Sequence, residues 1–354
     1  MFGTIGILTG GGDAPGLNAV IRAVVKTATC EYGIRVIGIE DGFEGLLGAT
    51  RTRLLSASDV RGLLPRGGTI LGTRNRGAFV ERACEGTDRD VESVYQEAIT
   101  NMKIVGIDAL VVLGGEGTLT IAAEFDKRGV PVCGVPKTID NDLACTELTF
   151  GFVTALDIAT EALDRLHTTA ESHDRVMILE VMGRHAGWIA LHSGIAGGAD
   201  VILIPEIPFD MQKVADKVMG RESGGSSFSI IVIAEGAVPK GGTAFYMAPG
   251  RLGGVGTAVN EQLGEMTGKD CRCVVLGHLQ RGGSPTPADR LLATRYGAAA
   301  VTALNDGITG EMVALRAQDI ITVPLESVIG HLKTVRPHND LIRTARGLGV
   351  GFGD

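Results

Sequence analysis

The sequence has 354 residues, of which 44% are hydrophobic and 21% are charged, and its formal net charge is −8. This length allows two domains with sizeable cores, and because only 4% of the residues are aromatic those cores must be aliphatic. The acidic balance disfavours a general nucleic-acid or anionic-membrane surface. No apolar run reaches the ~18 residues of a membrane span. We therefore expect neither nucleic acid nor a membrane as a partner.

The six cysteines show no Cys-x-x-Cys spacing. Thiols used as small core residues fit a reducing compartment, so we expect a cytoplasmic protein. A strand is expected directly after Met1, which leaves no room for a signal peptide. Glycine is the other unusual residue type: the 52 glycines are about twice the usual ~7%. They indicate many tight turns where backbone approaches backbone or a ligand.

In chain order, short apolar runs alternate with amphipathic stretches. A run at 4–9 is followed by three glycines and a helical pattern at 19–28, and a second strand is expected at 35–39. The strand–glycine loop–helix pattern returns from 109 and from 176. Further strands are predicted at 130–135, 201–204, 228–234 and 273–276. Continuously apolar strands that alternate with helices predict an α/β fold with mostly parallel sheets covered on both faces.

The domain organisation is suggested by two segments. A long helical pattern at 154–170 should carry the chain from one αβ domain into the next, and the Gly- and Pro-rich stretch 239–256 is the best loop or linker candidate. We expect a first domain of residues 1–150 completed by a returning segment near 279–328. The second domain would comprise 151–278 and the C-terminal segment 329–354.

Each glycine loop follows a strand and precedes a helix, where ligands of open α/β sheets collect. Glycines let the backbone approach an anion, and a helix N-terminus supplies free N–H groups. No loop matches the Walker A or dinucleotide pattern, and any single one could be an ordinary turn. Glu116 stands inside the second loop and would repel a phosphate unless a cation lay between them. It is therefore a natural Mg²⁺ ligand, with a dipole-stabilised helix start as the alternative.

A lysine and two carboxylates follow the strand at 130–135. Asp140 and Asp142 are two residues apart, so in extended backbone they face the same way. One could act as a base while the other helps to hold metal, and Lys137 could neutralise a phosphate, as phosphoryl transfer to a hydroxyl requires. A polar turn with Asx capping remains the alternative.

Cations gather at other loop positions of this acidic chain. His278 and Arg281 follow the strand at 273–276, and Arg184 with His185 lies in the third glycine loop. Arg175 follows the polar segment 171–174, and Arg272 lies just before His278. Clustered cations suggest an anionic small substrate, although any one arginine could form a surface salt bridge and His278 alone could be structural.

Five segments, in this order, resemble motifs of the 6-phosphofructokinase family. They are GGGDAPGLN at 10–18, GGEGT at 114–118, PKTIDND at 136–142, MGRH at 182–185 and GHLQRGGSP at 277–285. The resemblance implies two Rossmann-like three-layer αβα domains, the first for nucleotide and the second for sugar phosphate, with the active site in the cleft between them. It also implies transfer of a phosphoryl group from ATP to fructose 6-phosphate, with Mg²⁺.

The resemblance also implies roles for individual residues. Asp140 matches the catalytic base, Thr138 a residue near the transferred phosphoryl group, and Asp142 and Glu116 acidic positions around metal and phosphates. The cofactor-binding positions are Gly12, Arg74, Gly115, Glu116, Gly117, Thr118 and Lys137. The sugar-phosphate positions are Thr138, Asp140, Asp142, Arg175, Met182, Gly183, Arg184, Glu235, Arg272, His278 and Arg281, with Arg184 also grouped with the catalytic residues. In the family, Arg175 and Arg272 reach in from a neighbouring subunit, which implies a homo-oligomer, expected to be a homotetramer.

Some positions depart from the family pattern. Lys137 is typical of diphosphate-using members, whereas those members carry Asp where this chain has Gly117. A carboxylate there would crowd and repel the α-phosphate of ATP, and a lysine is compatible with either donor. ATP is therefore the favoured donor, with diphosphate as the alternative.

Two further departures concern arginines. The phosphate-bridging arginine of the family falls at about Asn75, so Arg74 or Arg76 could serve instead. In the effector site of ADP-activated members, Arg22 and Lys26 keep two basic positions. His167 stands where an arginine is expected, which argues against effector control by that route.

Overall fold

The computed structural model describes residues 2–84, 86–248 and 250–354. Two positions that the sequence analysis mentions lie outside the described residues. They are Met1, just before the first expected strand, and Pro249, in the predicted linker. The chain divides into two compact units. Unit 1 contains Met1–Thr138, Leu143–Val153 and Arg281–Leu332, and unit 2 contains Ile139–Asp142, Thr154–Gln280 and Lys333–Asp354.

Unit 1 is built on a sheet whose seven strands, among the described residues, run in the order β13-β12-β5-β4-β1-β2-β3. The outermost strands, β3 and β13, are antiparallel to their neighbours and the inner pairs are parallel. The strands are β1 (Thr4–Thr9), β2 (Arg35–Ile39), β3 (Thr52–Leu55), β4 (Ala109–Gly114), β5 (Val132–Pro136), β12 (Glu311–Arg316) and β13 (Asp319–Pro324).

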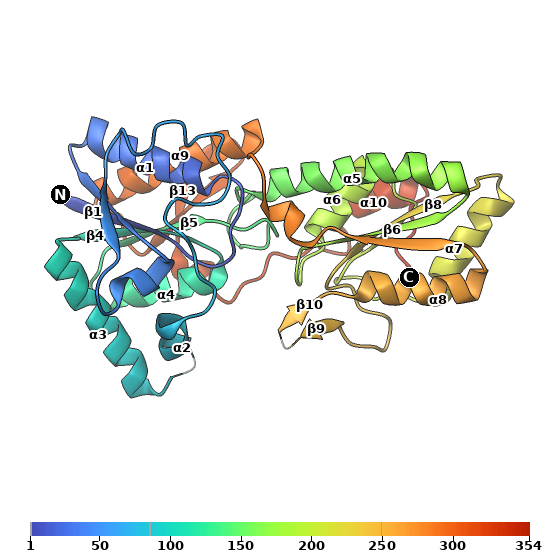
Figure 1. The fold of residues 1–354 in the computed structure, drawn as a ribbon, viewed down its shortest axis with the longest axis horizontal. Helices are drawn as coiled ribbons and strands as arrows, with labels where there is room; N and C mark the ends of the chain where they lie inside the picture. The colour runs from blue at the N-terminus through green and yellow to red at the C-terminus, as the bar shows by residue number, and fades with distance from the viewer. Residues whose placement is uncertain (1, 85, 249) are drawn as a thin grey trace. The chain divides into compact units, whose positions relative to one another are not determined.

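Helices cover both faces of this sheet (Figure 1). Helices α1 (Leu17–Glu31) and α9 (Pro287–Asn305) pack on one face, with α3 (Asp88–Val105) and α4 (Glu116–Lys127) on the other. Alternate residues of β4 enter the two cores, since Val111 packs with α1 and α9 whereas Leu110 and Val112 pack with α3 and α4. The remaining short elements are η1 (Gly42–Leu46), α2 (Ala78–Cys84) and η3 (Leu325–Ser327). This is the doubly covered α/β sheet that the strand pattern predicts.

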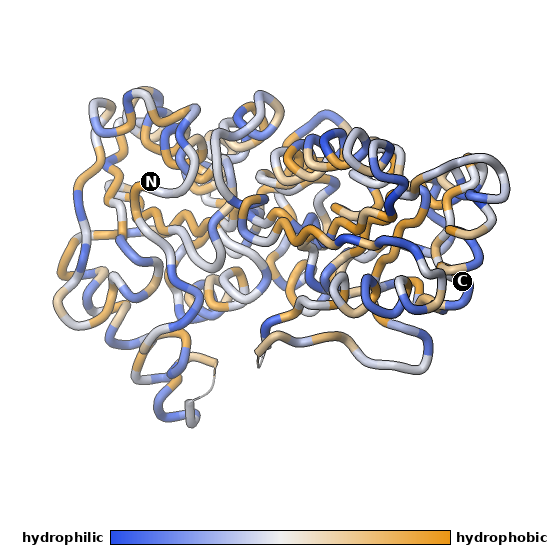
Figure 2. The backbone as a smooth tube through the Cα atoms, turned by 45° about the vertical axis from the view of Figure 1, so that its right-hand side comes forward, coloured by the Kyte–Doolittle hydropathy of each residue, from blue (hydrophilic) through white to orange (hydrophobic). Residues whose placement is uncertain are grey.

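Unit 2 has a smaller sheet with the order β11-β6-β8-β7, parallel throughout in the described part of the chain. Its strands are β6 (Val176–Val181), β7 (Val201–Leu203), β8 (Ser229–Ala234) and β11 (Cys271–Val275). Helices α7 (Met211–Ser223) and α8 (Val255–Thr267) cover one face. On the other lie α5 (Phe152–His173), α6 (Trp188–Ala196) and α10 (Asp340–Gly347) (Figure 1). Most residues of the central strands β6 and β8 are hydrophobic (Figure 2).

Several segments differ from the sequence-based expectation, among them the edge strand β3 (Thr52–Leu55), which was not predicted. The stretch 239–256, predicted as loop or linker, contains the hairpin of β9 (Tyr246–Ala248) and β10 (Arg251–Leu252) and the start of α8. The β12–β13 hairpin was not predicted, because its antiparallel edge lacks the strand–helix alternation that marked the other strands.

Each cysteine lies in the described residues and is a free thiol. Nowhere in the described ranges is a helix both long and apolar enough to cross a membrane.

Candidate active site

The first glycine loop of unit 1 connects β1 to α1. The Gly10 N–H donates to Leu113 O (2.9 Å), and the Gly11 N–H donates to Arg74 O (3.2 Å). Gly11 has φ +77°, a conformation that suits glycine. A Cβ at Gly12 would lie 2.8 Å from Nη1 of Arg281, whose guanidinium donates to Asp13 O at 2.8 Å. The loop therefore depends on glycine, and a cation stands against it.

The second glycine loop, after β4, packs against the first. Gly115 is the N-cap of α4, which begins at Glu116. Thr118 is buried, and a Cβ at Gly10 would lie 2.6 Å from its Cγ2 atom. A Cβ at Gly117 would meet nothing within 4 Å, so open space adjoins this position. Since β1 and β4 are parallel neighbours, both predicted phosphate loops lie at one sheet edge.

Glu116 is exposed at the start of α4, and its Oε1 accepts a hydrogen bond from the Gly330 N–H (2.9 Å). The residues described in the structure contain no group of three or more His, Cys, Asp or Glu side chains able to hold a metal ion. A lone carboxylate nevertheless fits Mg²⁺, which commonly takes one or two protein carboxylates and completes its shell with water and substrate phosphates.

Lys137 follows β5, the neighbour of β4, and reaches the first loop. Its ammonium donates to Gly12 O at 2.5 Å, its backbone N–H donates to Gly114 O at 3.0 Å, and the residue is 4% exposed. Thr138, the last residue of this part of unit 1, is also buried, and its carbonyl accepts from Thr149 Oγ1 (2.7 Å). Unit 1 thus brings a buried ammonium against the predicted phosphate loop.

The arginine-rich segment at 74–76 also borders this loop. The Arg74 side chain forms an ion pair with Asp41 (Nη2–Oδ2, 3.5 Å), while its carbonyl holds Gly11. Asn75, at the family's arginine position, lies with Oδ1 3.9 Å from the point where a Gly11 Cβ would be. Arg76 is exposed. The role of either arginine stays a prediction.

In unit 2 the third glycine loop follows β6. Gly183 (φ +141°) and Arg184 (φ +51°) both have positive φ, and the Arg184 N–H donates to Glu235 Oε1 at 3.1 Å. Glu235 follows β8, and its own N–H donates to Val181 O. Two residues predicted as sugar contacts are therefore joined directly. Gln280, which sequence reasoning missed, accepts from the Met182 N–H (2.8 Å) and is fully buried.

His278 belongs to the same sheet edge of unit 2. It is exposed in η2 (Gly277–Arg281), directly after β11, and β11 pairs in parallel with β6. The chain positions after β6, β8 and β11 are thus those predicted to bind sugar phosphate. Arg281 is assigned to unit 1, where it contacts the first glycine loop.

Arg175 and Arg272 lie at the opposite end of the same strands. Arg175 precedes β6, and Arg272 is the second residue of β11. Asp270 forms ion pairs with both, at 2.6 Å to Arg175 Nε. Its hydrogen bond from Arg175 is the main cause that lowers the pKa of Asp270. Because seven residues of extended chain span roughly 23 Å, Arg175 stands far from Met182 within one subunit.

Asp140 and Asp142 belong to unit 2, in the short segment Ile139–Asp142. Asp140 is 3% exposed, so a carboxylate is held in a nearly dry environment. Lys333, far away in the sequence, contacts this segment: its backbone N–H donates to Asp142 O at 2.8 Å. No local sequence signal marks Lys333 as part of the site.

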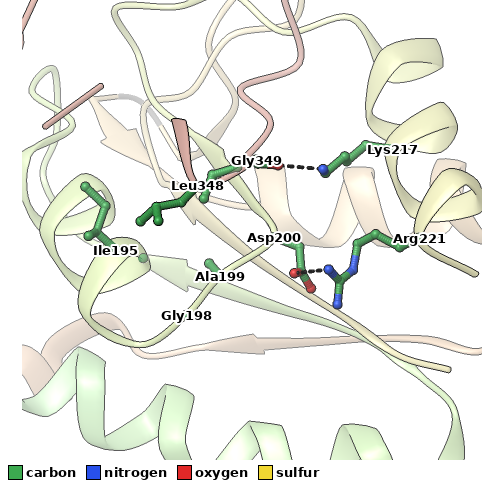
Figure 3. Close-up of a pocket in the computed structure, with 10 residues that line it drawn as sticks. Ile195, Gly198, Ala199, Asp200, Lys217, Arg221, Leu348 and Gly349 are labelled. Carbon is green, nitrogen blue, oxygen red and sulfur yellow. Dashed lines mark hydrogen bonds and ion pairs between the residues drawn. The ribbon is translucent and has the colours of Figure 1, made fainter. Parts of the chain in front are cut away.

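A cavity of about 260 Å³ lies elsewhere in unit 2, and its lining contains none of the predicted site residues (Figure 3). Asp200 forms an ion pair with Arg221 across it (2.8 Å), and Lys217 donates to Gly349 O (2.5 Å). Burial raises the pKa of Asp200.

Three residues were compared with the effector site of ADP-activated family members. Of these, His167 lies near the cavity, with its ring Nε2 donating to Gly197 O at 2.7 Å. Arg22 and Lys26 are on α1 of unit 1.

Comparison with known proteins identifies the family of this chain. The sequence model of the family described as "Phosphofructokinase" matches residues 4–304. The chain is 65% identical over 350 residues to an ATP-dependent 6-phosphofructokinase of Chloroflexus aurantiacus, covering 99% of this chain and 98% of the relative. It is 51% identical to a pyrophosphate–fructose 6-phosphate 1-phosphotransferase of Streptomyces coelicolor, covering 94% of this chain and 96% of that one.

Among solved structures, Pichia pastoris phosphofructokinase in the T-state superposes with a TM-score of 0.82 at 35% identity. The match covers 93% of this chain but spans only 35% of the Pichia chain. The family match over most of the sequence, the high identity along nearly its whole length and the shared fold lead to one conclusion. The chain belongs to the phosphofructokinase family.

Proposed function

We propose that the chain transfers the γ-phosphoryl group of ATP to the 1-hydroxyl of fructose 6-phosphate, a reaction of glycolysis that gives ADP and fructose 1,6-bisphosphate. The observation that carries phosphoryl transfer, with either donor, is the buried Lys137 ammonium against the glycine loop in unit 1. The 65% identity to an ATP-dependent 6-phosphofructokinase supports ATP as the donor. Unit 1 would be the nucleotide-binding domain and unit 2 the sugar-phosphate domain.

The donor phosphates would bind to unit 1. Glycines at 10–12 and 114–117 let backbone N–H groups approach the phosphates, and the α4 N-terminus adds a favourable dipole. Lys137 would neutralise charge that develops on the transferred group. Mg²⁺, held by Glu116, would neutralise further phosphate charge.

The acceptor sugar would bind to unit 2. Met182, Gly183, Arg184 and Glu235 would orient the sugar, and His278 would bind its 6-phosphate. Arg281, the second cation predicted to bind this phosphate, belongs to unit 1. Asp140 would take the proton of the 1-hydroxyl as that oxygen forms its bond to the γ-phosphorus. The bond from this phosphorus to the β–γ bridging oxygen breaks, and ADP leaves with the electron pair. Thr138 and Asp142 would flank the reacting groups.

Diphosphate is the second candidate donor. Lys137 and the 51% identity to a pyrophosphate-dependent relative favour it. The open space beside Gly117 favours ATP, because it leaves room for the α-phosphate that a carboxylate there would repel. We weigh this room more heavily, since a lysine is compatible with both donors.

We also propose a homotetramer in which Arg175 and Arg272 complete a neighbouring subunit's sugar-phosphate site. Their position at the far ends of β6 and β11 supports it, because within one subunit they lie far from Met182. Val275 and Leu279, 51% and 69% exposed, provide apolar surface at the carboxyl end of β11, which is the edge strand of this sheet. The free thiols fit the reducing cytoplasm. An ADP effector would not use the family route, because His167 is engaged with Gly197.

The purified chain can be assayed with fructose 6-phosphate and either ATP or diphosphate, with Mg²⁺ present and with Mg²⁺ chelated. We expect Mg²⁺-dependent formation of fructose 1,6-bisphosphate, with a higher kcat/KM for ATP. A higher kcat/KM for diphosphate would overturn the choice of donor. No bisphosphate with either donor would overturn the proposed function.

A further inference from the structure

The turn that carries Asp140 has an unusual backbone conformation. Asn141, between the two aspartates, has φ +52° and is 5% exposed. Residues with a side chain adopt this left-handed region only where their surroundings hold them, although asparagine tolerates it better than most. The direction of the Asp140 carboxylate therefore depends on whatever holds Asn141.

Lys333 holds this turn with two groups. Its ammonium donates to Asn141 Oδ1 at 2.8 Å, and its backbone N–H donates to Asp142 O at 2.8 Å. One contact fixes the side chain of Asn141, and the other fixes the peptide that follows. All three residues belong to unit 2. Together these contacts oppose relaxation of the turn toward ordinary backbone angles.

Lys333 is itself fixed in place. Its carbonyl accepts from Trp188 Nε1 at 2.8 Å, and two residues later the Val335 N–H donates to Glu206 Oε1 at 2.8 Å. The same Glu206 carboxylate accepts from the Gly187 N–H (3.0 and 3.1 Å). Segment 333–335, which we name the strap, is thus joined to the end of the predicted sugar loop. The backbone from which the Lys333 side chain extends is therefore held in a defined position.

The ammonium also acts as a charge in this part of unit 2. It is part-buried, and lies 6.0 Å from the centre of the Trp188 ring. Beside that ring stands His192, whose pKa is lowered by burial first and by the Lys333 charge second. Because the Lys333 charge lowers the pKa of a buried imidazole, solvent does not fully screen that charge.

We propose that Lys333 is a positioning residue for Asp140, which it orients by holding Asn141 and the Asp142 peptide from the strap. The inference rests on the proposed function, in which Asp140 takes the proton of the acceptor hydroxyl. A displacement of about 1 Å at a reacting group can cost roughly 100-fold in rate. Loss of the ammonium should therefore lower kcat and leave binding of the sugar phosphate largely intact.

The test compares Lys333→Met, Lys333→Arg, Asn141→Ala and the Met/Ala double variant in steady-state assays with ATP and fructose 6-phosphate. We expect Lys333→Met to lower kcat by about 10- to 100-fold, with KM for fructose 6-phosphate changed less than about threefold. The arginine variant, which keeps a charged donor, should recover most of the lost rate. The double variant should be no worse than the poorer single one, because both changes remove the same contact.

Lys217→Met is the matched control, since the Lys217 ammonium also donates a hydrogen bond within unit 2, in its case to Gly349 O. It should retain wild-type kcat. Trp188→Phe offers a second route if Lys333→Met does not fold. It removes the N–H donated to the strap and keeps a smaller aromatic ring, and it should lower kcat more than it changes KM.

Provided that the wild-type enzyme is active, the inference is overturned if the kcat of Lys333→Met stays within twofold of the wild-type value. Where Lys333→Met does not fold, the same result for Trp188→Phe overturns it. Independent, multiplicative losses in the double variant, or no recovery by arginine, would overturn it equally. A wild-type enzyme that does not phosphorylate fructose 6-phosphate would instead refute the proposed function.

Discussion

The ammonium of Lys137 donates a 2.5 Å hydrogen bond to the carbonyl oxygen of Gly12, 125 residues earlier in the chain. The contact joins the segment after β5 to the loop after β1 within unit 1. It fixes the buried positive charge of Lys137 beside the first glycine loop, where glycines leave the backbone uncovered by side chains. This is the relationship on which the donor half of the proposed reaction depends.

Lys137→Met should lower kcat/KM for ATP by about 100-fold, because a fixed donor to developing negative charge typically contributes that much. The KM for fructose 6-phosphate should change little. Lys127→Met is the control, since the Lys127 side chain is 55% exposed and pairs only at the surface with Glu124. Steady-state kinetics of the two variants provide the measurement, and equal effects would contradict a specific role for Lys137.

Gly117→Asp should abolish most ATP use, with kcat/KM falling at least ~100-fold through repulsion of the α-phosphate. The fold should persist, because a Cβ there meets nothing within 4 Å and a carboxylate in the first turn of α4 suits the helix dipole. Gly117→Ala should keep ATP activity. Kinetics and thermal unfolding of both variants would check this, and unaltered ATP use by Gly117→Asp would refute the donor argument.

The sequence predicts the strands of unit 2 well and the contacts of its site less well. The bounds predicted for β6, Val176–Val181, are those observed, because a continuous apolar run lies between charged Arg175 and a glycine loop. The hairpin of β9 and β10 fell in a stretch predicted as loop or linker, since Gly and Pro dominate its surroundings. Lys333 gave no signal, because its contact with Asn141 spans 192 residues.

Arg272→Ala should raise KM for fructose 6-phosphate by about 10- to 100-fold, with a smaller change in kcat, because it removes a charge-assisted contact to phosphate. The same holds for Arg175→Ala. Loss of either arginine also frees Asp270 of one ion-pair partner at the surface, so Asp270→Ala serves as the control for the ion pair itself. Its KM should rise less than that of the arginine variants.

Subunit mixing tests whether these arginines serve a neighbour. Hybrids assembled from inactive Asp140→Ala subunits and Arg272→Ala subunits should regain activity at saturating ATP and low fructose 6-phosphate. In such hybrids one shared site combines an intact Asp140 with an intact Arg272. Activity no higher than the sum of the separate variants would argue that each site is formed within a single chain.

The free energy of unfolding should depend on pH through His192. Its pKa in the folded chain is lowered from the ordinary 6.5, by burial first and by Lys333 second. Just below pH 6.5 the unfolded chain therefore binds more protons than the folded one, so stability falls as the pH falls through this window. Denaturant unfolding measured between pH 5.5 and 7.5 should show that the unfolding free energy of His192→Gln changes less steeply with pH than that of the wild-type chain. An unchanged pH dependence of the unfolding free energy in His192→Gln would contradict the assignment.

The most direct test of the account is the kinetics of Asp140→Ala with ATP and fructose 6-phosphate. Loss of a general base should lower kcat by about 100- to 10,000-fold, while the affinity for fructose 6-phosphate, measured by direct binding, stays within a few-fold of wild type. Turnover near the wild-type rate in a correctly folded variant would contradict the claim that the buried carboxylate of Asp140 accepts the hydroxyl proton.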